Sequence, residues 1–192
     1  MLRYNLSTVL LLLIAFLVQQ FVPAFTGLSH SRFLIVHLVF LCAAFTVTTP
    51  TMLLLAFIGG LLWDAHCFLP DIQADPEVYT QPAESLGFGY SILLFAAMGF
   101  LMQGLNPLFR QGKWHFSALL TGVAIFFYLT AEFTLLSFIR GEFVITRSVL
   151  RLLFYTSLLT MLLSPIVFWI LYRIARICDY SLYPAVHRPR RR

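Results

Sequence analysis

Charged residues are scarce in this sequence. Asp, Glu, Lys and Arg make up 11% of the 192 residues, whereas 60% are hydrophobic and 20 are phenylalanine. A soluble domain usually has about 25% charged residues, which keep its surface hydrated. The composition therefore excludes an ordinary soluble domain and predicts an all-α protein that lies mostly in the membrane.

Cysteine pairs and catalytic motifs are also missing. The three cysteines, Cys42, Cys67 and Cys178, contain no C-x-x-C spacing, so we expect free thiols. His66 and Cys67 are adjacent, whereas zinc ligands usually come as spaced pairs. The chain has no G-x-S-x-G or H-E-x-x-H motif and no phosphate-binding loop. We therefore expect neither an enzyme nor a resident metal or cofactor.

Six apolar stretches are long enough to cross a bilayer, which needs about 20 helical residues. Residues 33–70 are too long for one span, and the break is expected at 46–50, because Pro50 lacks an amide donor. A re-entrant pair in place of the second and third spans is the alternative. The first stretch exceeds a signal-peptide core and lacks a cleavage motif, so we expect it to be retained. The predicted spans are 6–25, two within 33–70, 86–105, 116–139 and 149–174.

Basic residues set the predicted orientation, because they are enriched in cytoplasmic loops. With the N-terminus inside, nine of the 13 Lys and Arg residues lie on the cytoplasmic side and four on the other. The sequence thus predicts one domain, residues 1–183, a bundle of six transmembrane helices in the bacterial inner membrane with both ends in the cytoplasm. The acidic loop 65–85 would be extracytoplasmic.

The net charge of +5 comes mostly from basic residues beside the membrane and does not indicate nucleic-acid binding. Residues 184–192 form a basic cytoplasmic tail. We interpret the cytoplasmic arginines as an orientation signal, and binding to membrane lipids or a protein is the alternative. These arginines include Arg173, Arg176, Arg190, Arg191 and Arg192.

Two acidic residues fall inside predicted spans. At 1.5 Å per residue, Asp64 lies about 21 Å along the third span and Glu132 about 24 Å along the fifth. Both would lie in the outer third of a bilayer about 30 Å thick. Arg147 and Arg151 begin the sixth span on that side, so we expect a cluster of acids and arginines. Ion pairs that lock the helices are the favoured interpretation, and a proton or cation relay is the alternative.

Small residues predict where helices pack closely. Ala56, Gly60 and Asp64 are spaced four apart and share one face of the third span, which allows close backbone approach. Gly87 begins a weaker face of this kind in the fourth span. His37, in the second span, has no evident partner, and we expect a packed, hydrogen-bonded residue.

Three segments share features with one family of membrane proteins. They are residues 59–64 (GGLLWD) with 85–89 (SLGFG), residues 131–133 (AEF), and residues 163–176, in which Pro165 precedes an apolar run ending on Arg173 and Arg176. These segments resemble MreD, the bacterial rod shape-determining membrane protein. The likeness lies in a glycine–aspartate and leucine–glycine signature, an acidic position, and the last helix.

The resemblance implies a non-enzymatic component of the elongation machinery that controls cell shape and lateral peptidoglycan synthesis. The implied partners are MreC, a single-span protein, then MreB filaments and the RodA and penicillin-binding-protein synthase pair. Gly60 and Asp64 would set the packing of the third span, Glu132 would join a buried polar cluster, and Pro165 would kink the sixth helix. Loop 65–85 is longer than the short link typical of the family.

A second interpretation belongs to another functional class. The MreD family is similar to the substrate-binding S-components of energy-coupling-factor vitamin transporters, which also have six spans. The acidic loop and a cluster of Asp64, Glu132 and Arg151 would then form a small-solute pocket at the outer face. Against this, the first span is rich in leucine and lacks an A-x-x-x-A docking face.

Overall fold

The computed structural model describes residues 2–22, 31–68, 89–105, 114–140 and 146–180. Within these ranges the regular secondary structure consists of six helices with no β-strand, which confirms the predicted all-α class. The helices are α1 (Leu2–Phe21), α2 (Ile35–Ala44), α3 (Thr49–Phe68), α4 (Tyr90–Gly104), α6 (Trp114–Arg140) and α7 (Arg147–Ile177).

The six helices differ in length. Three segments are long and apolar enough to cross a membrane: Leu2–Phe21, Ser117–Ile139 and Arg147–Ile177. By contrast, α2 has 10 residues and α4 has 15. At 1.5 Å per residue α2 is only about 15 Å long, half the thickness of the hydrocarbon core. The helix count thus matches the sequence prediction, while helix length does not establish six membrane crossings.

The predicted break in residues 33–70 is present. Helix α2 ends at Ala44, and α3 begins at Thr49 with Pro50 in its first turn. Proline is tolerated there because the first amides of a helix have no intrahelical partner. Thr46 holds the turn, since its hydroxyl and its amide both donate to the Ala43 carbonyl at 2.8 Å.

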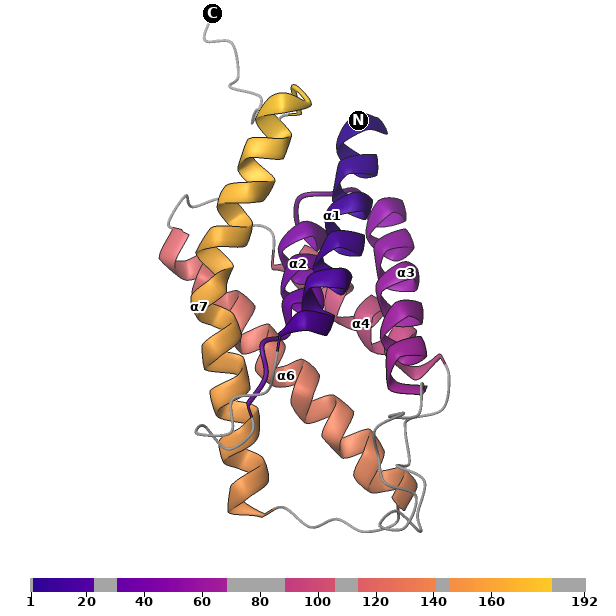
Figure 1. Cartoon of the computed structure of the whole chain (residues 1–192), viewed down its shortest axis with the longest axis vertical. Helices are drawn as coiled ribbons and strands as arrows, with labels where there is room; N and C mark the ends of the chain where they lie inside the picture. Colours follow the sequence, from indigo (N-terminus) through magenta and orange to yellow (C-terminus); the bar gives the residue numbers. More distant parts are fainter. Residues whose placement is uncertain (1, 23–30, 69–88, 106–113, 141–145, 181–192) are drawn as a thin grey trace, which may run out of the picture.

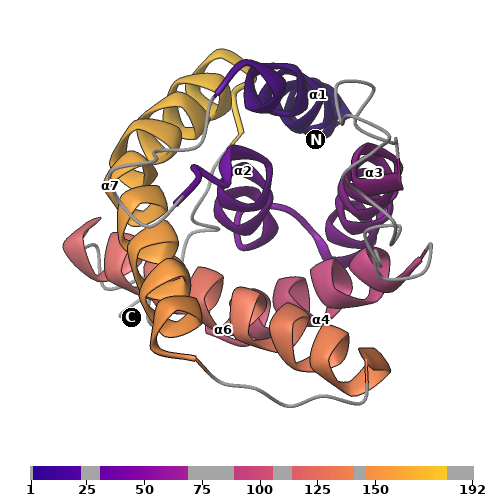
Figure 2. The same ribbon diagram turned by 60° about the horizontal axis from the view of Figure 1, so that its bottom comes forward.

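Helix α2 is the centre of the bundle. Figure 2 shows it surrounded by α1, α3, α4, α6 and α7, and it contacts all five. Nine of its ten residues are buried. A helix that is apolar all round has no face to expose, so it packs best when other helices cover every side.

The start of α1 and the end of α7 lie at the same end of the bundle (Figure 1). The rings of Tyr4 and Tyr180 stack there with centroids 4.3 Å apart. Tyr4 also donates a hydrogen bond to the Thr46 hydroxyl at 2.8 Å, and Tyr180 donates to the Thr46 carbonyl at 3.2 Å. These contacts join the first helix, the α2–α3 turn and the last helix.

Helix α7 continues through Pro165 without a break, from Arg147 to Ile177. We expected Pro165 to kink the helix, and the helix is continuous across this residue. The inward face of α7 is rich in small polar residues, and its outward face has large apolar ones. The buried residues are Thr156, Ser157, Thr160, Ser164, Val167, Leu171 and Ala175.

Candidate functional site: the polar residues around α3, α4 and α6

Asp64 connects α3 to the beginning of α4. Its side chain is 5% exposed, and Oδ2 accepts a hydrogen bond of 2.7 Å from the amide of Gly89. Gly89 precedes the first turn of α4 with φ +104°, a conformation that glycine adopts without steric cost. A carboxylate is favourable at this position because a helix N-terminus has free amides and a positive dipole end.

Gly60 lies one turn before Asp64 and faces the same helix. A Cβ atom at position 60 would lie 2.5 Å from Cα of Ile92 and 2.6 Å from its amide nitrogen. Helices α3 and α4 therefore touch backbone to backbone, and they form the most extensive helix pair in the described chain. Ala56, a further turn back, is also buried.

Glu132 of α6 is half-buried beside the end of α3. Its carboxylate is within electrostatic range of the Trp63 side chain and of Asp64. The Trp63 nitrogen is buried and has no partner at hydrogen-bonding distance among the described residues. The two acids predicted to lie together, one from α3 and one from α6, are therefore within electrostatic range of each other.

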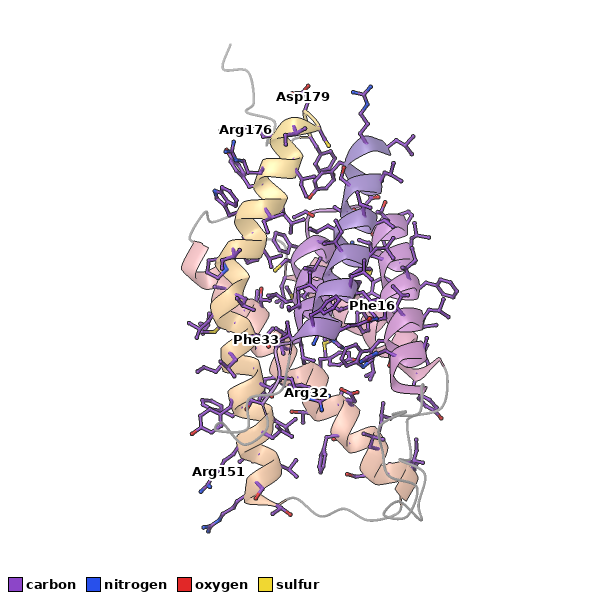
Figure 3. The ribbon with its side chains drawn as sticks, in the orientation of Figure 1. Phe16, Arg32, Phe33, Arg151, Arg176 and Asp179 are labelled. Atoms are coloured by element: carbon purple, nitrogen blue, oxygen red, sulfur yellow. The ribbon has the colours of Figure 1, made fainter. Side chains whose placement is uncertain are left out.

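The predicted arginine half of this cluster is not formed. Arg147 and Arg151 are both exposed, and Figure 3 shows Arg151 pointing away from the bundle. Within the described residues neither arginine forms an ion pair with Asp64 or Glu132. The reason is helical periodicity: Ser157 and Thr160 face inward, which turns positions 147 and 151 outward.

His37 lies at the middle of the bundle in the first turn of α2. It is 1% exposed and is surrounded by three rings: Trp63 at 4.5 Å, Phe95 at 4.7 Å and Tyr128 at 4.3 Å between centroids. The expected packing is present. The expected hydrogen bond is not found in the described chain, where both ring nitrogens lack a partner. The cause is the aromatic surroundings, which offer ring faces and edges.

A polar clamp at the beginning of α2 was not predicted. Gln19 of α1 donates from Nε2 to the Phe33 carbonyl, and its Oε1 accepts from the Ile35 amide, both at 2.6 Å. The Leu34 amide donates to the Thr160 hydroxyl of α7 at 3.3 Å. The only available signal was a Gln pair, residues 19 and 20, near the end of an apolar stretch. Sequence alone does not say which of the two faces inward.

The described residues offer no group of three or more His, Cys, Asp or Glu side chains placed to bind a metal ion. Cys42 and Cys178 are free thiols. Several predicted features lie outside the described residues: Gly87, most of loop 65–85, and the tail 184–192 with Arg190, Arg191 and Arg192.

The fold and its polar residues define a helical bundle with apolar outer faces, an apolar central helix and a few buried polar side chains. Comparison of the chain with protein-family models, with curated proteins and with solved structures gave no match.

Proposed function

We propose that the chain is a six-span protein of the bacterial inner membrane with both ends in the cytoplasm. Three helices are long and apolar enough to span. The distribution of side chains on α7, with hydroxyls inside and large apolar residues outside, is typical of helices that pack in lipid. Under this proposal the short helix α2 is shielded from lipid by the five helices that surround it, and α4 is a short member of that surrounding ring.

The outward face of α7 supports the membrane assignment. Its apolar stripe has a basic pair at each end. Arg173 follows Arg151 by 22 positions, which correspond to about 33 Å of helix. This is close to the hydrocarbon thickness of about 30 Å. Every residue of the stripe is at least 41% exposed: Phe154, Leu158, Leu162, Ile166 and Trp169.

We further propose a non-enzymatic scaffold of the MreD type, which binds MreC and supports cell elongation. The observation that carries this proposal is the Asp64–Gly89 hydrogen bond. It joins the two halves of the signature on which the resemblance depends, residues 59–64 and 85–89, although 25 positions separate the bonded residues. The Gly60–Ile92 contact makes the same helix pair tight.

Co-purification with MreC tests this function. The tagged chain would be extracted from its own organism in a mild detergent, and MreC would be detected by mass spectrometry. We expect MreC in stoichiometric amounts, and depletion of the chain should make rod-shaped cells round. An absence of MreC together with unchanged cell shape would contradict the proposal.

A small-solute-binding transport subunit is the second candidate. The buried His37 nitrogens and the Trp63 N–H, which lack partners in the described chain, together with two acids, favour a polar ligand. The same purified sample discriminates between the two functions. A vitamin-like compound released on denaturation, without MreC, would support the transport subunit.

A further inference from the structure

Two arginines near the end of α7 lie over aromatic rings of the same helix. The Cζ atom of Arg173 is 5.5 Å from the ring centroid of Trp169, and that of Arg176 is 5.3 Å from the ring of Tyr172. Arg176 also donates to the Tyr172 hydroxyl at 3.3 Å. Each pair is spaced four apart, so one helical turn brings ring and guanidinium together. These cation–π contacts hold the two planar guanidinium groups in a fixed orientation.

No acid neutralises these arginines in the described chain, where neither of them forms an ion pair. Asp179, the nearest acid along the sequence, follows the helix end with φ 48°. Residues 181–192 contain no Asp or Glu at all. The guanidinium N–H groups therefore remain available to an anion, and a phosphate suits their fork geometry.

The same face continues from the arginines as an exposed apolar surface. Trp169 is 62% exposed, and Ile166 and Leu162 follow at one-turn spacing with 55% and 63% exposure. Figure 3 shows Arg176 at one end of α7 and Arg151 at the other, both pointing away from the bundle. A ligand that used the whole surface would have a negative head group and long apolar chains.

We propose that Arg173 and Arg176, together with Trp169 and Tyr172, form a binding site for the phosphate head group of an anionic phospholipid. The acyl chains lie along the apolar stripe toward Leu162. This site depends on the proposed orientation, which puts the end of α7 in the cytoplasmic leaflet. A free phosphate ion would use the arginines but gain nothing from the stripe.

The other end of α7 provides a matched control. Arg147 and Arg151 are also exposed and end the same stripe, but neither lies over an aromatic ring within the described residues. Replacing this pair changes the net charge by the same amount without touching the proposed site.

Native mass spectrometry of the full chain in a mild detergent tests the proposal, with phosphatidylglycerol and phosphatidylcholine as probes. Wild type should retain phosphatidylglycerol in preference to phosphatidylcholine. Arg173→Gln with Arg176→Gln should weaken that retention about thirtyfold, which corresponds to about 1 kcal/mol for each arginine. Arg147→Gln with Arg151→Gln should leave it unchanged. Thermal unfolding of both double variants checks that each is folded.

Trp169→Leu separates a formed site from general electrostatic attraction, because it keeps both charges and the apolar surface. We expect weaker phosphatidylglycerol retention in this variant. The proposal would be overturned if Trp169→Leu retained as much phosphatidylglycerol as wild type. It would also be overturned if the two double variants lost phosphatidylglycerol equally, or if millimolar inorganic phosphate displaced the lipid. MreC takes no part in this measurement, so its result is independent of the test of the scaffold function.

Discussion

Single polar side chains fix the geometry of this largely apolar bundle. Asp64 binds the amide of Gly89, and Gln19 satisfies two backbone groups where α2 begins. In an apolar interior little water is present to replace a lost hydrogen bond, so the loss of either side chain leaves polar groups poorly paired. His37 is different, because its buried ring packs against aromatic neighbours and is held by shape.

Asp64→Leu should destabilise the protein by about 1–3 kcal/mol, because the partly buried Gly89 amide loses the charged acceptor Asp64. Asp64→Asn keeps a carbonyl oxygen and should lose about half as much, since only the charge assistance is removed. Thermal unfolding in detergent measures both. Equal stability of Asp64→Leu and wild type would contradict the anchoring role.

Gln19→Leu should cost about 2 kcal/mol, because it removes the hydrogen bonds that Gln19 forms with the Phe33 carbonyl and the Ile35 amide. Gln20→Leu is the matched control: the neighbouring residue is of the same type but exposed, so we expect a change within about 0.5 kcal/mol. The comparison uses the same unfolding measurement. If the two variants were equally unstable, the loss would come from the composition of α1 and not from the clamp.

At the scale of helices, close approach and periodicity explain the arrangement. Gly60 lets the backbones of α3 and α4 meet. The Ser157 hydroxyl of α7 donates to the Gly122 carbonyl of α6 at 2.6 Å, which joins that second pair. Helix α2 is held in place by the five helices that cover it.

Gly60→Ala tests the closeness of the α3–α4 pair. Alanine favours helix by about 1 kcal/mol over glycine, but its Cβ would overlap the Ile92 backbone, and overpacking typically costs 1–3 kcal/mol. We expect a net loss of stability and poor accumulation of the protein in cells. Gly104→Ala, at the end of α4, meets nothing within 4 Å and should be neutral or slightly stabilising. A stabilised Gly60→Ala variant would show that the helices are further apart.

At the scale of the whole molecule, the described helices are arranged as one central helix, α2, with the other five around it (Figure 2). The first helix and the last are joined through Tyr4, Thr46 and Tyr180 at one end. This contact agrees with an even number of crossings, which the proposed topology requires.

Reporter fusions test the topology. A fluorescent protein fused after residue 192 should fluoresce, because it would fold in the cytoplasm. Alkaline phosphatase inserted within residues 69–88 should be active, since it would reach the oxidising side of the membrane. An inactive phosphatase at that position would refute the six-span orientation.

Much of this architecture follows from the sequence alone. Apolar runs and their breaks determined the number of helices, because an unbroken backbone hydrogen-bond ladder suits long apolar segments and Pro50 does not fit within one. The sequence also identified Asp64, Gly60 and Glu132 as residues needing an explanation, since polar and small residues are exceptions in such runs.

Only the tertiary structure decided which of these polar and small residues contact one another. Asp64 pairs with a backbone amide 25 residues away, while the predicted arginine partners face outward, because the rotation of α7 about its axis depends on all its inward contacts. The central position of α2 and the clamp by Gln19 likewise come from packing between distant segments. Periodicity assigns each residue to a face of its own helix, whereas the neighbour that covers that face is set by the whole bundle.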